Sequence, residues 1–345
     1  MEGMFGAAGG SKRAKVGLLG LADGSSLGFL RAFWAGPETD PTKQLNWIDV
    51  SRYVYHYTTV RGFMGIVESG GFWASDNRFM NDSVERSHGR EFAAEIVAEE
   101  IARVGPASSF GQILAEVRKE LLVPNSRGQL VTCFSLSCDN LDQWRGYGAG
   151  GGICIELDTN MKVTNPVFGG ALLLRHRVTY SDDAKADFIR LTIRKYEREH
   201  TRDTDVKGSP LPNDEPRQYS MYLLSSMAGA VAGFKHRSFV SENEVRLVIP
   251  FEALDKCFDE GLQFRSSEYG PVPYVNTAKI KPGIIPWPVP GQPDTPITFG
   301  LPISRVIIGP SSRQQLIADS VSTYLQHKGY PQVSVELSSV PFRGS

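Results

Sequence analysis

Residues 53–75 place a strand, a short helix and a second strand in close succession, and this order constrains the fold most strongly. The run Tyr53–Thr58 is rich in aromatic and β-branched residues, which favour strands. Thr59–Glu68 carries apolar residues at near-helical spacing, and the glycines that follow it stop a helix. A second short strand is predicted at Phe72–Ser75. The unit predicts a domain in which strands and helices are mixed.

One imidazole, His56, interrupts the first predicted strand, and a polar loop with Asn81, Asp82 and Glu85 follows the second. A titratable ring at the edge of a strand and a nearby carboxylate loop indicate one wall of a cleft. A hydrogen-bonded histidine of the core would produce the same pattern. Asp82 is also expected to cap the helix that begins near Val84, because Asp accepts backbone amide hydrogens well at that position.

Composition excludes several classes of protein. The formal net charge of −1 over 345 residues argues against a generally basic nucleic-acid-binding surface, although a local patch remains compatible with it. The chain has four cysteines: Cys133, Cys138, Cys154 and Cys257. They have neither zinc-type spacing nor the density of a secreted disulfide scaffold, which favours a cytoplasmic protein. No run approaches the ~20 apolar residues of a membrane span, so no membrane partner is expected.

The length fits one elaborated domain at 46–345, which follows an amino-terminal tail at 1–45. Two amphipathic patterns predict a helical insert at 84–123. A proline-rich surface loop is predicted at 281–302. Together these features predict a single α+β domain.

Ala184–His200 predicts a further helix with a basic face. The basic residues of this helix are Lys185, Arg190, Arg194, Lys195 and Arg198. This face could meet a phosphate backbone. The interleaved Asp187, Glu197 and Glu199 favour an ordinary solvated face instead.

Leu130–Ser137 predicts a buried strand, and a short aromatic segment follows it. Trp144 and Tyr147 are three residues apart, which on a helical turn places both rings on one side. The pair is either a core plug or a platform for a flat ring. The glycines of 146–152 contain a literal G-x-G-x-x-G, but they open a strand at Ile153–Leu157 rather than a helix. We therefore reject a dinucleotide-binding fingerprint.

The nearly uncharged segment Gln218–Phe234 predicts a buried helix, and the strand predicted at Phe239–Pro250 carries the strongest chemical signal. With period-2 alternation, Glu242, Glu244 and Arg246 fall on one face of this strand. Two carboxylates and a guanidinium are costly to bury unless they pair or serve a site. A solvent-facing edge strand with an internal ion pair would explain the same pattern. Neighbouring carboxylates tend to raise each other's pKa, which is common in working sites.

Short motifs follow one another in a fixed order: Y-H-Y-T, N-D-x-x-E, C-F-S with D-x-x-x-x-W-x-x-Y, E-x-E-x-R, I-I-G-P and S-S-V-P-F-R. This order resembles a large bacterial family known only as a domain of unknown function, over roughly Tyr53–Arg343. A second, weaker resemblance is to ADP-ribosyltransferases, particularly the DarT-type enzymes that modify nucleic acid. Those enzymes begin with a similar strand–helix–glycine–strand unit and end with a catalytic Glu on a strand. The resemblance implies an α+β fold with a split, twisted, ADP-ribosyltransferase-like central sheet.

The second resemblance implies NAD-dependent ADP-ribosyl transfer, with NAD as a substrate and a nucleic acid or protein as acceptor, in a toxin or anti-phage effector. It implies catalytic roles for Glu244, Glu242 and His56. It also implies a set of residues that contact NAD: His56, Tyr57, Thr58, Phe72, Ser135, Trp144, Tyr147 and Arg246. The chain departs from the pattern at Phe72 and Trp73, where the His-type branch has a Tyr. The combination of a His with an E-x-E pair also mixes two branches.

These residue types suit the implied chemistry. A carboxylate can stabilise the oxocarbenium-like state that forms when the nicotinamide–ribose bond breaks. An imidazole can hold a ribose, aromatic rings can clamp nicotinamide, and no metal is required. For this activity His56, Trp144 or Tyr147, and Glu244 should line one cleft. A structure with His56 and Glu244 on opposite faces of the sheet, or with their side-chain tips more than roughly 15 Å apart, would contradict this site and the transferase prediction with it.

Three other functions remain open from the sequence. A metal-dependent nuclease could use four oxygen ligands for Mg²⁺: Asp82, Glu85, Glu242 and Glu244. A Cys133–His56 hydrolase is less favoured, because Cys133 lies in an apolar strand where thiols are usually inert. A non-catalytic ligand-sensing module predicts a closed site without a reachable carboxylate.

Overall fold

The structure is a computed structural model of the chain. It describes residues 52–79, 83–123, 129–148, 151–159, 174–207, 215–250, 254, 258, 260–267, 270–279 and 300–341. The chain divides into two units, Met1–Asp40 and Pro41–Ser345, and every described residue belongs to the second unit. The predicted tail at 1–45 and most of the predicted loop at 281–302 therefore lie outside the described residues.

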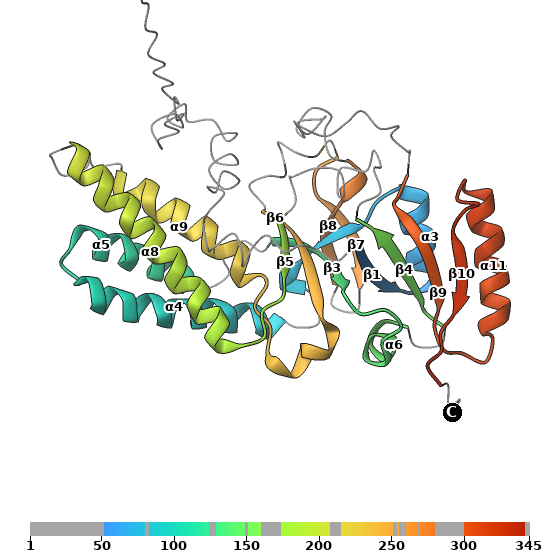
Figure 1. Ribbon diagram of the computed structural model, residues 1–345. Coiled ribbons are helices and arrows are strands. Elements are labelled where there is room, and N and C mark those ends of the chain that lie inside the picture. Colours follow the sequence, from blue (N-terminus) through green and yellow to red (C-terminus); the bar gives the residue numbers. More distant parts are fainter. Residues whose placement is uncertain are drawn as a thin grey trace, which may run out of the picture. The chain divides into compact units, whose positions relative to one another are not determined.

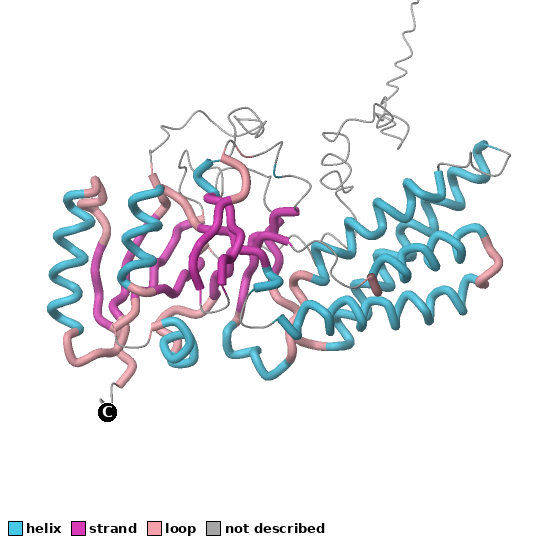
Figure 2. Tube along the Cα trace, turned by 180° about the vertical axis from the view of Figure 1, so that it is seen from behind, coloured by secondary structure: helices cyan, strands magenta, loops and turns pink. Residues whose placement is uncertain are grey.

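The described part of the second unit contains a mixed, open and twisted sheet of ten strands (Figures 1 and 2). The strands are β1 (Tyr53–Thr58), β2 (Trp73–Asp76), β3 (Gln129–Ser135), β4 (Ile153–Asp158), β5 (Leu174–Arg177), β6 (Glu244–Pro250), β7 (Gln263–Ser267), β8 (Gly270–Asn276), β9 (Ile303–Ile308) and β10 (Ser334–Leu337). Strands β9 and β10 pair in parallel, whereas the other pairs are antiparallel. The fold is α+β, as the sequence predicts.

Strand β3 has three neighbours, and this arrangement opens the sheet. Strand β6 pairs with β3 along its whole length, from Gln129 to Ser135. Strand β1 pairs with β3 only at Tyr55–Ser135, and β2 pairs with it only at Val131 and Leu130. A strand has two hydrogen-bonding edges, so β1 and β2 share the edge that β6 leaves free. The two strands diverge beside β3, and the sheet parts between them.

Three helices pack against strands of the sheet: α3 (Val60–Ser69), α6 (Leu141–Tyr147) and α11 (Gln314–His327). Helix α3 begins after Thr59, whose side chain accepts a hydrogen bond from the backbone N–H of Gly62. It ends at Gly70, which has a left-handed conformation with φ 68°. This is the glycine stop that the sequence predicts, because glycine adopts that conformation without a steric penalty.

Four further helices form a bundle with its own core (Figure 2). They are α4 (Ser83–Val104), α5 (Ser109–Leu121), α8 (Asp182–Lys207) and α9 (Glu215–Val231). The predicted insert at 84–123 supplies only the first two helices. The other two join them because their apolar sides, with Ile189, Ile193 and Leu223 fully buried, enter the same core.

None of the helices in the described part of the chain has the length and apolar character that crossing a lipid bilayer requires.

Glycines from two distant segments make room for one indole ring. Gly309, which follows β9, donates a hydrogen bond to the carbonyl of Gly152 at 2.8 Å. A Cβ atom at Gly309 would lie 2.8 Å from Cε3 of Trp144, and one at Gly148 would lie 2.7 Å from the same carbon. Both distances are shorter than a side chain tolerates. The I-I-G-P motif and the glycine run before β4 therefore serve packing, in agreement with the rejection of a dinucleotide site.

Gly309→Ala should lower the free energy of unfolding by about 1–3 kcal/mol, because the added methyl group overpacks the rigid indole of Trp144. Urea denaturation at neutral pH measures this change. The matched control is Gly146→Ala, since a Cβ atom there has nothing within 4 Å, and alanine favours the helix by roughly 1 kcal/mol. Equal effects of the two variants would contradict the packing role of Gly309.

Candidate functional site

One transverse row joins the three strands that carry the main motifs. Tyr55 of β1 lies opposite Ser135 of β3, and Ser135 lies opposite Glu244 of β6. Residues directly opposite each other on neighbouring strands point to the same face of a sheet. The Y-H-Y-T, C-F-S and E-x-E-x-R motifs are therefore side by side, although they come from distant parts of the sequence.

On this face lies a group of four charged residues, Lys235, Glu242, Glu244 and Arg246, which we call the carboxylate cluster. All but Glu242 are buried, and Glu242 is partly buried. The carboxylate of Glu244 accepts hydrogen bonds from Nε and Nη2 of Arg246 at 2.7 and 2.9 Å. The ammonium of Lys235 lies 2.7 Å from Oε2 of Glu242 and 3.3 Å from Oε2 of Glu244. Two cations thus balance two carboxylates.

Glu244 is ionised in this environment. Its side chain is 6% exposed, and burial alone would raise its pKa. The charge and hydrogen bonds of Arg246, together with the charge of Lys235, outweigh burial and lower the pKa of Glu244 to about 2. The side chain of Glu242 is more accessible, at 18%.

The prediction that Glu242 lies on the same strand as Glu244 is wrong. Glu242 ends a 3₁₀ helix, η3 (Arg237–Glu242), and Asn243 follows in a left-handed conformation with φ 45°. Strand β6 begins only at Glu244. Asn adopts the left-handed conformation more readily than most residues. Asn243 therefore interrupts the strand predicted at Phe239–Pro250, and only the part from Glu244 onwards is extended. The two carboxylates meet because Lys235 bridges them.

Lys235 is a site residue that the sequence analysis missed. Its side chain is 3% exposed. It lies four residues after Val231, the last residue of α9, and directly follows Phe234, which belongs to the bundle core. Nη1 of Arg246 donates to the carbonyl of Ala232 at 2.7 Å and holds the same segment against β6. The available signal was a single lysine at the end of a nearly uncharged segment.

Of the two predicted aromatic residues, only Tyr147 is accessible. Trp144 is 4% exposed, its indole N–H donates to Asp139 at 2.8 Å, and its ring packs 4.9 Å from that of Tyr57. Trp144 is therefore a core plug, and its assignment to NAD binding is wrong. Tyr147 is 44% exposed. Burial of its hydroxyl and the nearby Cys133 and carboxylates raise the pKa of Tyr147, which places it beside the carboxylate cluster.

His56 lies on the opposite face of the sheet from Glu244. Its neighbours Tyr55 and Tyr57 pack on the face of the cluster, with Trp144, so alternation turns His56 the other way. Its ring contacts Phe134 and Phe72, with centroids 5.5 and 5.0 Å apart. The prediction that His56 and Glu244 line one cleft is wrong, and the transferase prediction in the form that includes His56 fails with it.

The imidazole of His56 is a core group. Nδ1 lies 3.0 Å from the carbonyl oxygen of Cys133, to which it donates. Burial lowers the pKa of His56 to about 4, so the ring is neutral at pH 7. It fills the space between the diverging strands β1 and β2, which is the alternative that the sequence left open.

Two further predicted NAD contacts lie away from the cluster. Phe72 is fully buried beside His56, and its backbone N–H donates to Oγ1 of Thr277 at 2.8 Å. Thr58 is two residues after His56 in β1, so it shares the face of His56. Strand alternation places Thr58, and the ring contact with His56 places Phe72, so their assignment to the same site as Glu244 is wrong.

Tyr57 and Ser135 lie on the face of the cluster, but their hydroxyls bind backbone. The hydroxyl of Tyr57 donates to the carbonyl of Ser137 at 2.8 Å. That of Ser135 donates to the carbonyl of Glu242 at 2.7 Å. Ser135 therefore positions Glu242, and both residues fix the loop that joins β3 to α6.

Asp139 connects two of the motifs to each other. Its carboxylate accepts hydrogen bonds from the indole of Trp144, from the hydroxyl of Ser338, and from the backbone and hydroxyl of Ser339 at 2.8 and 2.9 Å. Burial opposes ionisation, but these donors lower the pKa of Asp139. The D-x-x-x-x-W and S-S-V-P-F-R motifs thus form one structural contact rather than a catalytic one.

The structure contradicts the Cys133–His56 hydrolase. Cys133 lies opposite Arg246 and faces the carboxylate cluster, whereas His56 faces the other way and binds only the carbonyl of Cys133. Burial and the charge of Glu244 raise the pKa of the Cys133 thiol, which disfavours the reactive thiolate.

Two of the four predicted magnesium ligands, Glu242 and Glu244, belong to the residues whose side chains the structure describes. Asp82 lies outside the described residues, as does the side chain of Glu85. Among the residues that the structure describes, no three His, Cys, Asp or Glu side chains are placed to hold a metal ion. Glu242 and Glu244 have Lys235 and Arg246 as partners where the nuclease would need Mg²⁺. The predicted cap at Asp82 also stays a prediction.

Glu244→Gln should lower the free energy of unfolding at pH 7 by about 3 kcal/mol, because it leaves the buried guanidinium of Arg246 without its anion and removes one of the two carboxylates that Lys235 contacts. The pKa of Glu244 is lower in the folded chain, about 2, than its ordinary value of 4.5. Its stabilisation is therefore complete above pH 4.5 and is lost as the pH falls towards 2. Chemical denaturation of both proteins at several pH values should show their difference shrinking across that interval.

The control is Glu336→Gln, which removes a carboxylate that is 50% exposed and pairs with Arg305 at the surface. Surface pairs contribute about 0–1 kcal/mol. A Glu244→Gln variant that loses no more stability than this control would contradict the buried role of Glu244.

The comparisons with known proteins identify one family. The family described as "Protein of unknown function (DUF2971)" matches residues 143–247, from Gln143 in α6 to Leu247 in β6. No curated protein and no solved structure matches the chain. The matched region contains every member of the carboxylate cluster, and the match confirms the predicted resemblance to a domain of unknown function. Residues 143–247 of the chain are therefore similar to the DUF2971 family, whose function is unknown.

Proposed function

We propose that this protein is an NAD-dependent ADP-ribosyltransferase in which Glu244 and Glu242 are the catalytic carboxylates. The transverse row of Tyr55, Ser135 and Glu244 supports this proposal most directly, because it brings the three motif strands of the resemblance together. His56 takes no part, since its imidazole lies on the other face. The site therefore consists of the carboxylate cluster and Tyr147.

Glu244 would stabilise the developing ribosyl cation. In the reaction the bond between nicotinamide and ribose breaks, nicotinamide leaves with the bonding electron pair, and positive charge develops on the ribose. An ionised carboxylate in a water-poor site stabilises such charge strongly. Arg246 keeps Glu244 ionised through two hydrogen bonds. The longer contact of Glu244, that with Lys235 at 3.3 Å, is the one that a ribose hydroxyl would replace.

Glu242 and Tyr147 suit the outer part of the site. Glu242 is the more exposed of the two carboxylates, so it can orient the acceptor nucleophile and take its proton as the new bond to ribose forms. Tyr147 offers an exposed ring beside both, on which nicotinamide can stack. A nucleic acid or a protein would serve as the acceptor.

A second function, a non-catalytic ligand-binding module, is favoured by one observation. Arg246 binds both oxygens of Glu244, and a carboxylate engaged in this way can have a purely structural role. Calorimetric titration with NAD separates the two functions. A sensor would bind NAD, or another ligand, without releasing nicotinamide.

Glu244→Gln should lower nicotinamide release at least about 100-fold, because a neutral amide stabilises positive charge poorly. Glu242→Gln should suppress transfer and spare part of the NAD hydrolysis, since water needs less positioning than a specific acceptor. Release and label transfer are measured with radiolabelled NAD and cell extract, below the unfolding temperature of each variant. Identical losses of nicotinamide release and label transfer in both variants would contradict the separate roles of Glu244 and Glu242.

His56→Gln is the matched control, because glutamine can still donate to the carbonyl of Cys133. It should leave KM for NAD within about twofold of the wild-type value and reduce only stability, as a core substitution does. A large rise in KM would show that His56 contributes to NAD binding. Wild-type protein that neither binds nor consumes NAD would remove the transferase proposal altogether.

A further inference from the structure

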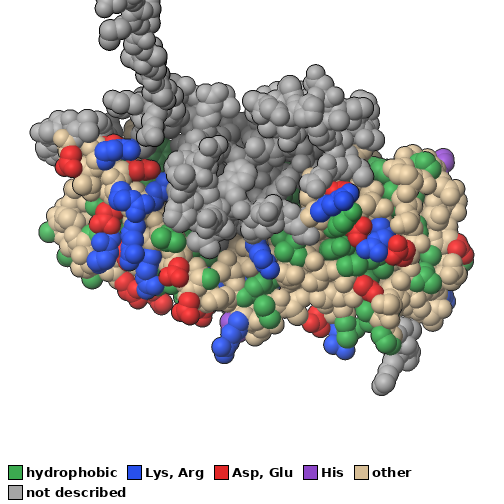
Figure 3. All heavy atoms as spheres, viewed as in Figure 1, with side chains coloured by type: hydrophobic (Ala, Val, Ile, Leu, Met, Phe, Trp, Pro, Cys, Tyr) green, Lys and Arg blue, Asp and Glu red, His purple; other side chains and the backbone are tan. Residues whose placement is uncertain are grey.

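The exposed side of α8 carries three arginines at four-residue intervals, Arg194, Arg198 and Arg202, which we call the arginine line. Four residues of α-helix rise about 6 Å, so the line extends over about 12 Å. Figure 3 shows Lys and Arg side chains gathered over α8 on the face drawn there. The side chain of Arg202 is 61% exposed, and Arg194 and Arg198 are also exposed.

Two acidic residues of the same helix, Glu197 and Asp203, bind side chains of neighbouring helices. The carboxylate of Glu197 accepts hydrogen bonds from Arg103 of α4, the shorter at 2.5 Å. That of Asp203 accepts one from the hydroxyl of Tyr219 of α9 at 2.6 Å. Alternating charges in the sequence favoured a mixed, solvated face. In the structure, contacts within the bundle engage these two carboxylates, whereas Asp205 is exposed one turn from Arg202.

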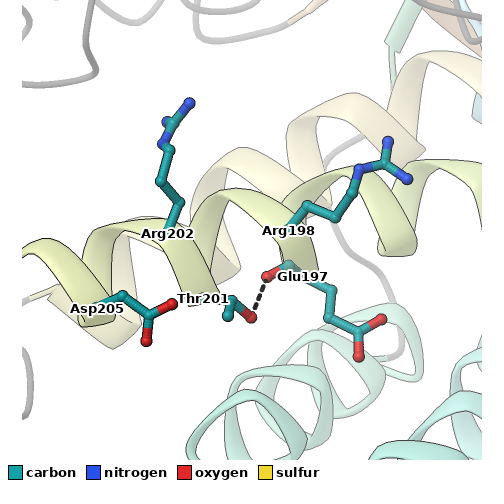
Figure 4. A pocket seen from close by; sticks show the side chains of 5 residues that line it. All are labelled: Glu197, Arg198, Thr201, Arg202 and Asp205. Carbon is teal, nitrogen blue, oxygen red and sulfur yellow. Dashed lines mark hydrogen bonds between the residues drawn. The ribbon is translucent and has the colours of Figure 1, made fainter.

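The arginines of the line form few ion pairs or hydrogen bonds with other described residues of the protein. Within the described residues Arg194 and Arg198 make no hydrogen bond or ion pair, and Arg202 has one loose contact, Nε to Oδ1 of Asp203 at 3.5 Å. An open hollow of about 480 Å³ adjoins the line. It is lined by Glu197, Arg198, Thr201, Arg202 and Asp205. In Figure 4 the guanidinium groups of Arg198 and Arg202 extend away from the two carboxylates.

We propose that the arginine line binds the phosphodiester backbone of a nucleic acid. Guanidinium groups bind phosphate through two parallel hydrogen bonds, which favours phosphate partners. Three such groups in a row suit a polymer with regularly repeated charges better than a single small anion. The net charge of the chain is −1, so no general attraction to a polyanion adds to this local one. The surface lies on a different element from the carboxylate cluster, and either proposal can fail without the other.

Fluorescence anisotropy with the full chain tests the proposal, with fluorescein-labelled single-stranded and duplex DNA of about 20 nucleotides as probes. Three phosphate contacts predict a slope of log K against log salt of about −2 for the single strand and about −3 for the duplex. The variant Arg194→Gln/Arg198→Gln/Arg202→Gln should weaken binding at least about tenfold at roughly 50 mM salt and flatten both slopes.

The matched control is Arg118→Gln/Lys119→Gln/Arg313→Gln, which removes the same charge from exposed positions elsewhere. It should change binding less than about twofold if the contacts are local. A third variant, with lysines at the three positions of the arginine line, keeps the charge and should retain most of the affinity and the slopes. Binding by the lysine variant would show that the loss of affinity in the glutamine variant comes from the lost charge and not from misfolding.

Three results would overturn the proposal. The first is wild-type protein that fails to bind either probe at about 50 mM salt, where phosphate contacts are strong. The second is an equal loss of affinity in the two glutamine variants. The third is displacement of labelled DNA by polyglutamate as effectively as by unlabelled DNA, which would assign the surface to an acidic protein. Nicotinamide release should be unaffected in all of these variants.

Discussion

The pairing of Glu244 with Arg246 and Lys235 is the interaction on which the centre of the structure depends. Three of the four charged residues, Lys235, Glu244 and Arg246, are buried, and burying charges is costly unless pairing offsets the loss of hydration. Each partner therefore has to be held in place by its own element. Strand β6 supplies Glu244 and Arg246, and the segment after α9 supplies Lys235 and the carbonyl that anchors Arg246. The cluster thus joins the end of the bundle to the middle of the sheet.

The two faces of the sheet have different chemistry near this point. One face carries the ionised cluster and an accessible tyrosine. The other carries a neutral histidine among phenylalanine rings, where burial rather than a partner charge sets its protonation. The polar motifs of the chain are therefore not all parts of one site. Some serve chemistry or ligand binding, and others, such as Asp139 and Gly309, fix the position of Trp144.

This difference between the two faces explains which features could be predicted from the sequence and which could not. Periodicity predicted β1, the helices of the bundle and the apolar side of β6, because these depend on local spacing. The face on which His56 lies depends on the pairing of Tyr55 with Ser135, and a shift of one residue would reverse it. No local pattern contains that register. Glu242 was misplaced for a different reason, since one residue in a left-handed conformation, Asn243, ended the strand. The role of Lys235 required knowledge of both neighbours in space.

The junction of Phe234 and Lys235 places adjacent residues in two separate environments. The phenyl ring belongs to the core of the bundle, and the ammonium group of the next residue belongs to the carboxylate cluster. An inserted residue between them would force one side chain out of its environment, either leaving a cavity in the bundle or leaving two carboxylates without their bridge. Substitution can be tolerated at such a point where the volume or charge is kept, but insertion and deletion cannot. The junction therefore constrains the length of the chain here, and not only its composition.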